Sequence, residues 1–572
     1  MTEKIILSDN CLEVKCSRDD VDTQSKLEEF YPITINRIKT NYKLSMHLLP
    51  EVLRSLRGID ETNIGTAPRK VQDYFYKEFF IRRGVNDLIK NGPKKSHVVN
   101  KNLTLMRHQQ LGREIAEIND RFAFFYDTRT GKTPLSLAIM HDDLMKHPNN
   151  KWLVVCPLIL IDNAWLPDAE EFVPDLKVVN CHASTKAKRL KKLAEEAQIY
   201  ITNTQSFTNY REAFEALHFE GCIVDESSDM KSAKSKVSKS LVEFAQTVKK
   251  FYLLSGTPAP NGEYEYYMQL KAIDFYGMQP NYTRFKKRYF TNISYNPQYE
   301  KLMLRDDRKE ELLSLIKEHA LYVDKEDVLT TPGRVFHEVE LEMPPALKKH
   351  YTNLKNKFCV ELEGESTITV PSAAAKINKL NQVSSGFIID TQAIKENKFY
   401  EESNEKEWHL LDDFRFKELM KLLDKQGVKN EQVLIWANYR AEFTMIKELL
   451  GDNCRCIYGG TTIEEKTSAI KLFKEGKIQY LVANPASADK GLTLTNAHIA
   501  IYFSLNWSYE LFKQSMERIY GSIKKQPKPC DYYILIVKGT VDRVIYSDVL
   551  IGKRSASTAI LDHLKGGSDE RP

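Results

Sequence analysis

Two sets of short apolar runs, separated by helix-length amphipathic stretches, recur along the 572-residue chain. The first set is RFAFFYD (121–127), KWLVVCP (151–157), QIYITN (198–203), GCIVDE (221–226) and FYLLSGT (251–257). The second set is QVLIWAN (432–438), CRCIYGG (454–460), IQYLVAN (478–484), AHIAIYFS (497–504) and DYYILIV (531–537). Runs that are apolar on both alternations are typical of strands buried on both faces of a parallel sheet. The strand–helix–strand order therefore predicts two tandem α/β lobes.

The two sets divide the chain into parts with different compositions. We expect an N-terminal accessory domain over residues 1–100, a first lobe over 101–275, a charged helical insertion and linker region over 276–410, a second lobe over 411–555, and a C-terminal tail over 556–572. Residues 1–100 carry aromatic and basic positions but no clear motif. An ordinary accessory domain and a substrate-recognition module both remain open for them.

Charge and cysteine content narrow the class of protein. Lys and Arg total 83 and Asp and Glu total 78, which gives a net charge of +5. That excess is too small to indicate nucleic-acid binding by itself, so local basic clusters such as RFKKRYF (284–290) matter more. The nine cysteines show no CxxC pair or zinc-ligand spacing, which favours a reducing, intracellular environment. Neither a signal peptide nor a membrane-spanning segment is predicted.

The stretch DTRTGKT (127–133) follows an apolar run and precedes a helical pattern. This context suits a phosphate-binding loop, because backbone N–H groups and a helix N-terminus favour phosphate. Lys132 would reach the β- and γ-phosphates, and the Thr133 hydroxyl would bind Mg²⁺. The pattern GxxxxGK[ST] places a glycine at position 126, where this chain has Tyr126. From these residues alone, a turn with a chance GKT remains the alternative.

A pair of carboxylates ends the fourth run of the first set, in VDESSDMKS (224–232). An Asp at a strand end can hold Mg²⁺, and a neighbouring Glu can polarise the attacking water. We therefore predict that Asp225 contacts the metal and that Glu226 is the catalytic residue. The alternative is a plain acidic loop after a strand.

The motifs of the first half resemble those of the superfamily-two helicases, and within them the Swi/Snf-type double-stranded-DNA translocases. DTRTGKT is similar to the phosphate loop of that family, which commonly lacks the first glycine; the matching nucleotide contacts are Thr130, Gly131, Lys132 and Thr133. LMRHQQLG (105–112) is similar to the adenine-binding motif, with Gln109 as the base contact. LLSGTPAPNG (253–262) is similar to the motif that couples hydrolysis to movement, through Ser255, Gly256 and Thr257.

The second half continues the resemblance in the order of the family. VLIWANYRAEF (433–443) resembles a motif that touches the nucleic-acid backbone. ANPASADKGLTLTNA (483–497) resembles the motif between DNA and nucleotide, with Gly491 and Thr495 as the best matches. QSMERIYG (514–521) resembles the final motif QxxxRxxR, with Gln514 and Arg518 in place. Gly521 stands where the second arginine belongs, and such an arginine finger can contribute about 10³-fold or more in rate.

The resemblance implies two tandem RecA-like lobes and an ATP-driven motor that uses ATP and Mg²⁺. Lys132, Thr133 and Asp225 would hold the nucleotide and metal, and Arg518 would sense the γ-phosphate. The compact chain resembles phage or bacterial members, which implies a cytoplasmic, monomeric protein of a bacterial or virus-infected cell. Replication, recombination or fork remodelling would be its setting. An RNA-directed helicase and a DNA-binding scaffold that has lost hydrolysis are the alternatives.

A translocase grips the phosphate backbone and ignores base identity. The predicted DNA contacts are Thr202, Asn203, Arg284, Lys286, Lys287, Asn438, Arg440 and Thr495. Strand-end caps and solvated charged faces are the ordinary alternatives for residues of these types.

Overall fold

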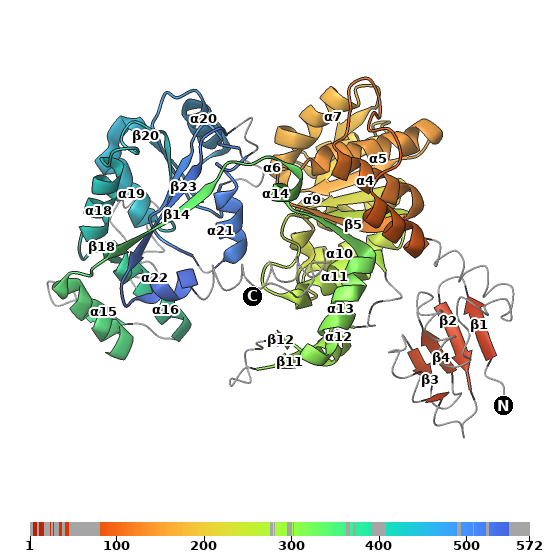
Figure 1. The fold of residues 1–572 in the computed structure, drawn as a ribbon, viewed down its shortest axis with the longest axis horizontal. Coiled ribbons are helices and arrows are strands. Elements are labelled where there is room, and N and C mark those ends of the chain that lie inside the picture. The colour runs from red at the N-terminus through yellow and green to blue at the C-terminus, as the bar shows by residue number, and fades with distance from the viewer. Residues whose placement is uncertain are drawn as a thin grey trace. The chain divides into compact units, whose positions relative to one another are not determined.

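The computed structural model describes residues 81–274, 278, 281–293, 300, 302–357, 359–361, 367–369, 373–389, 408–488, 493–506, 508–521 and 526–547, with short segments between residues 4 and 44. The chain divides into two compact units, and the division falls between Val328 and Leu329 (Figure 1). Each unit is built around its own parallel sheet. The predicted C-terminal tail, 556–572, lies outside the described residues.

The first unit contains a seven-stranded parallel sheet in the order β13-β5-β10-β9-β6-β8-β7. Its strands are β5 (Arg121–Tyr126), β6 (Trp152–Cys156), β7 (Val178–Asn180), β8 (Ile199–Asn203), β9 (Gly221–Asp225), β10 (Lys250–Leu254) and β13 (Ala320–Val323). Strand β5 is buried on both faces: Phe122 and Phe124 join one apolar core, and Ala123 and Phe125 join the other. Burial on both faces explains why the predicted runs are apolar on both alternations.

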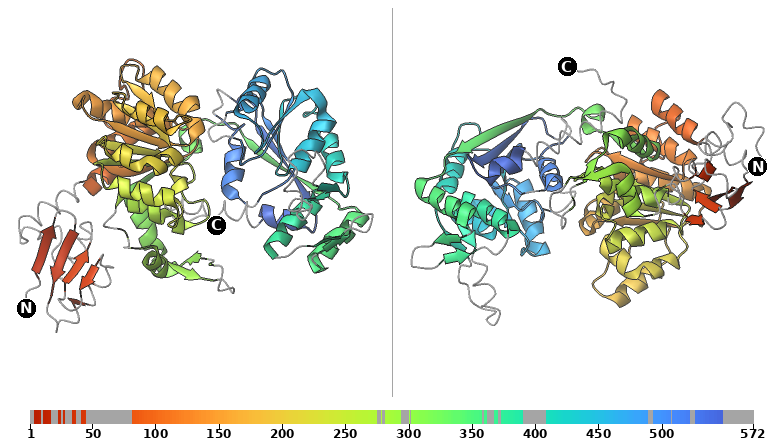
Figure 2. Two further views of the ribbon diagram at one scale, coloured as in Figure 1. Left: turned by 180° about the vertical axis from the view of Figure 1, so that it is seen from behind. Right: turned by 90° about the horizontal axis from the view of Figure 1, so that it is seen from below.

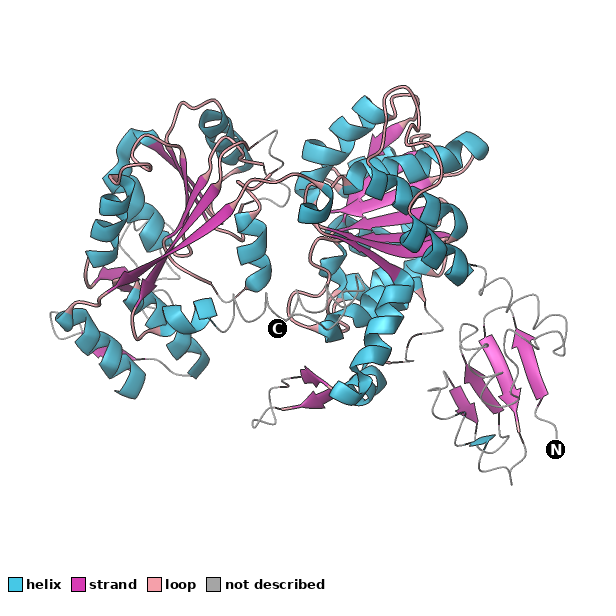
Figure 3. Cartoon of the chain, viewed as in Figure 1, coloured by secondary structure: helices cyan, strands magenta, loops and turns pink. Residues whose placement is uncertain are grey.

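Helices cover both faces of this sheet, as Figure 3 shows. One face packs against α4 (Arg107–Ile118), α5 (Lys132–Lys146) and α7 (Leu166–Phe172). The other face packs against α9 (Thr204–Glu215), α10 (Lys236–Ala245), α11 (Tyr266–Ile273) and α13 (Asp306–His319). Short α12 (Tyr282–Tyr289) and the hairpin β11 (Phe290–Asn292) with β12 (Leu302–Leu304) extend this second layer.

The second unit contains a six-stranded parallel sheet in the order β14-β23-β22-β19-β21-β20. Its strands are β14 (Arg334–Leu341), β19 (Val433–Trp436), β20 (Cys454–Ile457), β21 (Tyr480–Ala483), β22 (Ile499–Tyr502) and β23 (Cys530–Val537). Helices α18 (Phe414–Leu423) and α19 (Arg440–Leu450) pack on one face, and α20 (Ile463–Lys474) and α21 (Tyr509–Met516) pack on the other (Figure 2). The predicted pair of RecA-like α/β lobes is confirmed.

The region 276–410 contributes to both sheets. Strand β13 pairs with β5 at the edge of the first sheet, and β14 pairs with β23 over eight residues at the edge of the second. Within the second unit, Arg415 and Asp542 form a buried ion pair at 2.9 Å. Ser384, at the end of α16 (Ala373–Ser384), donates a hydrogen bond to the same carboxylate, so α16 is held to this pair. This region is therefore more than a linker, because it completes each lobe.

Four short strands form a separate antiparallel sheet near the N-terminus. They are β1 (Lys4–Ser8), β2 (Cys11–Lys15), β3 (Thr34–Asn36) and β4 (Asn41–Leu44), in the order β1-β2-β4-β3. An accessory domain over 1–100 remains a prediction. Among the described residues, no helix combines the length and apolar character needed to cross a membrane.

Candidate nucleotide and nucleic-acid site

Three neighbouring parallel strands end at the three motifs predicted to handle the nucleotide. Strand β5 leads into the phosphate loop (127–131), β10 into the loop 255–262, and β9 into the acidic loop (225–230). The order β5-β10-β9 is continuous, and Leu254 is in register with both Phe124 and Asp225. Ligands of open α/β sheets bind at the carboxyl ends of the strands, so the topology brings these loops to one edge.

The phosphate loop is shaped by its own backbone. The Thr130 hydroxyl donates to the carbonyl oxygen of Asp127 at 2.7 Å, and the Asp127 N–H donates to Val323 of β13 at 2.9 Å. Gly131 has φ of +85°, a conformation that favours glycine, and helix α5 begins immediately after it. The Lys132 ammonium donates to the carbonyl oxygen of Tyr126 at 3.1 Å, across the loop. The loop thus presents a helix N-terminus and a cation on one side.

Helix α4 holds the loop from outside. His108 Nε2 lies 2.7 Å from the carbonyl oxygen of Thr130, which can only accept, so Nε2 carries the proton. Burial lowers the pKa of His108, which keeps the imidazole neutral near pH 7. Gln109 donates to the carbonyl oxygens of Thr130 at 3.2 Å and Gly131 at 3.1 Å. Its amide therefore braces the loop in this structure, and the adenine contact remains a prediction.

The acidic loop has an unusual backbone. Glu226 adopts φ of +55°, which is strained for a non-glycine residue. Asp225 Oδ1 accepts the Glu226 N–H at 3.0 Å, and Asp225 Oδ2 accepts the indole N–H of Trp165 at 3.0 Å. These two bonds fix the orientation of the Asp225 carboxylate at the end of β9. Trp165 was not expected from the sequence, because it lies outside every motif.

The loop after β10 packs directly on the phosphate loop. A Cβ added at Gly256 would lie 3.3 Å from the backbone N of Thr128, so only glycine allows this approach without displacement. The Thr257 N–H donates to Ser255 Oγ at 3.1 Å and fixes the turn. On the other side, the buried Lys325 donates to the Thr128 hydroxyl at 3.4 Å. Of the three residues predicted to couple hydrolysis to movement, Gly256 thus packs on the nucleotide loop, and Ser255 and Thr257 shape the turn around it.

The side chains at the ends of β5 and β9 are of the types that bind a nucleotide together with a divalent cation. Gly131 adds no side chain of its own at the N-terminus of α5, where the Gln109 amide lies, and Lys132 supplies the positive charge. Among the described residues, no group of three His, Cys, Asp or Glu side chains could hold a metal unaided. A cation at Thr133 and Asp225 would need phosphate oxygens as well, which is how Mg²⁺ commonly binds with nucleotides.

The predicted DNA contacts of the first unit are placed unevenly. Thr202 is fully buried in this structure, and its contact with DNA remains a prediction. Asn203 directly precedes α9 without a capping hydrogen bond from its side chain, and its Oδ1 lies 3.3 Å from His182 Nδ1. On α12, Lys286 is paired with Glu300, and Arg288 with Glu311. The outward positions are the two exposed ones, Arg284 and Lys287.

Two of the predicted second-unit contacts, Asn438 and Arg440, follow the carboxyl end of β19. Asn438 follows β19, and its amide is engaged inside the unit, because Nδ2 donates to Ser504 and Oδ1 accepts from Asn506. Arg440 is exposed at the start of α19, beside a groove of about 1000 Å³ that Tyr458 and Thr461 also line. The Asn438 side chain thus makes hydrogen bonds within the second unit, whereas the exposed Arg440 side chain can reach a ligand.

The final motif is largely buried. Gln514 donates to Glu510 at 3.3 Å, and Arg518 is 6% exposed. Beside them, Arg334 stacks 4.2 Å above the ring of Tyr520 and lies 3.5 Å from Glu517. Thr495 is half-buried. Gly491 lies outside the described residues.

Two family models match the chain in the order of its lobes. The SNF2-related domain matches residues 123–399, and the helicase conserved C-terminal domain matches residues 415–520. A putative protein of Acyrthosiphon pisum secondary endosymbiont phage 1 is 24% identical, over 76% of this chain and 92% of its own length. The human SWI/SNF-related matrix-associated actin-dependent regulator of chromatin subfamily A member 1 is 22% identical, over 75% of this chain.

The chain spans only 41% of the length of that human protein. Among solved structures, the Sulfolobus solfataricus SWI2/SNF2 ATPase core in complex with double-stranded DNA is 19% identical, with a TM-score of 0.36, over 83% of this chain and 95% of that one. The assignment rests on the two domain models, which cover both lobes in sequence. The chain belongs to the Swi/Snf-type family of helicase-like ATPases.

Proposed function

We propose that this ATPase translocates on duplex or forked DNA and serves replication, recombination or fork remodelling. The observation that carries the proposal is the meeting of Lys132, Glu226 and the 255–257 loop at the ends of β5, β9 and β10. A residue that binds phosphate, a residue that activates water and a loop that can transmit movement then share one edge. A protein that merely bound DNA would have no need of this arrangement.

The chain's own residues suggest how hydrolysis would proceed. ATP with Mg²⁺ supplies the γ-phosphate and the charge that the loop neutralises. Lys132, which bonds the Tyr126 carbonyl in this structure, would hold a phosphate oxygen, and Asp225, bonded by Trp165, would help to hold the cation. The Glu226 carboxylate orients the attacking water and receives its proton. Gly256, in contact with the phosphate loop, would report the change to the rest of the lobe.

DNA is the favoured track because family membership and the exposed cations agree. Arg284 and Lys287 on α12 and Arg440 on α19 are exposed cations of the kind that neutralise phosphates. The insertion KLNQVSSGF (379–387), which resembles that of the double-stranded-DNA translocases, argues against an RNA-directed helicase.

The test is ATP hydrolysis measured without nucleic acid and with single-stranded DNA, duplex DNA, forked DNA and RNA. The blank is Glu226→Gln, which keeps the shape and removes the base. Glu243→Gln on the exposed side of α10 is the matched control and should behave like the wild type. We expect duplex or forked DNA to give the strongest stimulation. Stimulation by RNA alone would favour the RNA-directed helicase.

A hydrolysis-deficient scaffold is the second candidate, and Gly521 favours it. Gly521 leaves the final motif without its second arginine, a loss worth about 10³-fold or more in related enzymes. The scaffold predicts ATP binding without turnover on every nucleic acid. Turnover that the Glu226→Gln blank abolishes would rule the scaffold out.

A further inference from the structure

A fully buried glutamine connects two of the loops at the candidate site. Gln269 lies on α11, where the neighbouring residues Met268 and Leu270 are apolar and buried. Its Oε1 accepts the hydroxyl proton of Ser227 at 2.8 Å, and its Nε2 donates to the carbonyl oxygen of Pro258 at 2.7 Å. Ser227 directly follows Glu226, and Pro258 directly follows Thr257. One side chain therefore bridges the acidic loop and the loop after β10.

The orientation of this amide is fixed by its partners. Nε2 faces two carbonyl oxygens, those of Pro258 and of Glu265 at 3.3 Å, and carbonyl oxygens can only accept. A flipped amide would place Oε1 against both acceptors and lose these bonds. The bridge thus has one arrangement, in which a hydroxyl donor comes from the acidic loop and the acceptors come from the loop after β10.

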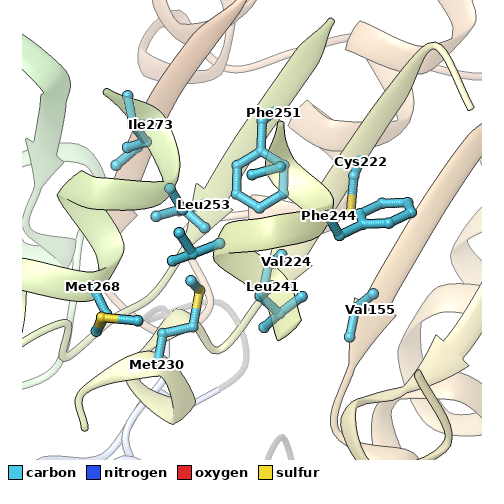
Figure 4. Close-up of a cluster of buried hydrophobic side chains, with 14 of the residues drawn as sticks. Val155, Cys222, Val224, Met230, Leu241, Phe244, Phe251, Leu253, Met268 and Ile273 are labelled. Atoms are coloured by element: carbon cyan, nitrogen blue, oxygen red, sulfur yellow. The ribbon is translucent and has the colours of Figure 1, made fainter. Parts of the chain in front are cut away.

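The acidic loop also packs against β10 and α11 through an apolar cluster. Met230 ends the short helical turn of the acidic loop and is fully buried in the cluster that contains Leu253 and Met268. Figure 4 shows Met230 on the side of that cluster occupied by Leu253 and Met268. Burying the Gln269 amide among apolar side chains costs free energy unless the amide is hydrogen-bonded. Its three bonds account for its place in an apolar core.

Glu226 needs such a support. A non-glycine residue at φ of +55° persists only where its surroundings hold it, because relaxation to an ordinary backbone would release strain. On its amino side, Asp225 Oδ1 accepts the Glu226 N–H. On its carboxyl side, Ser227 is held by Gln269. Both neighbours of Glu226 are therefore fixed, and Gln269 provides the second attachment.

We propose that Gln269 is a positioning residue that locks the Glu226 backbone in its strained form and ties it to the 255–258 loop. The proposal rests on the proposed function, in which Glu226 activates water. Gln269 is fully buried and bonds Ser227, Pro258 and Glu265, so its loss would act through the backbone beside Glu226. The bridge continues through Gly256 to Thr128 of the phosphate loop. DNA-stimulated turnover is then the quantity that depends on Gln269 most, and ATP binding depends on it least.

The test replaces Gln269 by Met, which has a similar volume and cannot form the three bonds. We expect kcat for DNA-stimulated hydrolysis to fall about tenfold, the size of effect that losing buried hydrogen bonds produces. We expect the KM for ATP to stay within about twofold, because Lys132 and Gly131 are untouched. An unchanged kcat would overturn the proposal, and so would a KM that rises as much as kcat falls.

Two further variants separate positioning from general damage. Ser227→Ala removes one arm and leaves the bonds of Gln269 to Pro258 and Glu265, so it keeps the inference testable if Gln269→Met does not fold. The double variant should be no slower than Gln269→Met alone, since both changes break one bridge. Gln432→Met removes three hydrogen bonds in the second unit, two to the carbonyl oxygens of Phe473 and Ile478 and one from the amide of Asn496. It should leave kcat unchanged.

Amide hydrogen exchange supplies a measurement that does not depend on turnover. Gln269→Met should speed exchange in peptides covering 225–230 and 255–262, and leave α5 at the wild-type rate. Exchange at the wild-type rate in both loops would overturn the proposal. A wild type that hydrolyses no ATP but shows this response would refute the proposed function while retaining Gln269 as the support of Glu226.

Discussion

Gly131 and Gln109 lie so close that a Cβ added at Gly131 would come within 1.9 Å of Gln109 Nε2. The φ of +85° at Gly131 adds a second obstacle to any side chain there. Two independent constraints, one on the backbone and one on space, thus act at the residue that opens α5. The braced loop needs a glycine at this position.

Gly131→Ala should lower ATP affinity by at least about tenfold, which corresponds to about 1.4 kcal/mol. The new Cβ must displace Gln109 and with it the loop carbonyls that Gln109 holds. Equilibrium binding of ATP measures the effect. Gly476→Ala is the matched control, because Gly476 has φ of +70° with nothing within 4 Å of its Cβ position. That control should lose about 1 kcal/mol of stability and no affinity. Wild-type affinity in Gly131→Ala would refute the prediction.

Two buried tryptophans offer a paired experiment on the metal site. Trp165 donates its indole N–H to Asp225 at 3.0 Å, and Trp152 donates its own to Asp143 at 2.9 Å. Trp165→Phe should raise the Mg²⁺ concentration for half-maximal hydrolysis by about tenfold, as loss of a group that orients a metal ligand does. Trp152→Phe should destabilise the fold without this shift. Equal Mg²⁺ dependence in the two variants would mean that Trp165 only packs.

His108 makes the stability of the first unit depend on pH. Because its pKa in the folded chain is lowered by burial, the unfolded chain binds the proton first as the pH falls below about 6.5. The contribution of His108 is therefore complete above that pH and declines as the pH falls toward the lowered value. Urea unfolding at pH 5 and pH 8 should show a smaller loss in His108→Gln than in the wild type. Identical losses would contradict the burial argument.

The sequence predicts the central strands well and the edge strands poorly. Runs such as FYLLSGT are apolar on both alternations because the side chains of β10 enter the apolar cores on both faces of the sheet. Strand β14 does not show this pattern, because charged and apolar residues alternate in its sequence RVFHEVEL. The charges are met by side chains distant in sequence, as where Arg543 pairs with Glu338 and Glu340. No local pattern reveals such partners.

The same distinction applies to the candidate site. Residues that end strands, such as Asp225 and Ser255, are predictable because parallel strands share one carboxyl edge. His108, Trp165 and Gln269 come from helical segments and belong to no predicted function. Only one signal was present for Gln269, a polar residue within the apolar stretch YYMQLKAI of α11. A sequence pattern does not show which loops such a residue joins.

The structure distinguishes between neighbouring cations of the basic cluster on α12, which the sequence alone does not. Arg288 Nε donates to Glu311 at 2.6 Å, and Tyr289 donates to the same carboxylate at 2.9 Å. Lys287 points outward from the neighbouring position and is exposed. The two cations are adjacent in sequence and differ in environment. Comparing a Lys287 variant with an Arg288 variant therefore distinguishes a cation that contacts DNA from a cation that stabilises the fold.

Lys287→Ala should weaken duplex DNA binding for every sequence and reduce the slope of log affinity against log salt by about one, as loss of one phosphate contact does. Arg288→Ala should leave the slope unchanged and lower the free energy of unfolding, because Glu311 loses one of its two arginine partners and keeps Arg308. Binding titrations at several salt concentrations, with urea unfolding of each variant, measure both quantities. A slope unaffected by Lys287→Ala would remove α12 from the DNA-binding surface and leave Arg440 of the second unit as the exposed cation to test next.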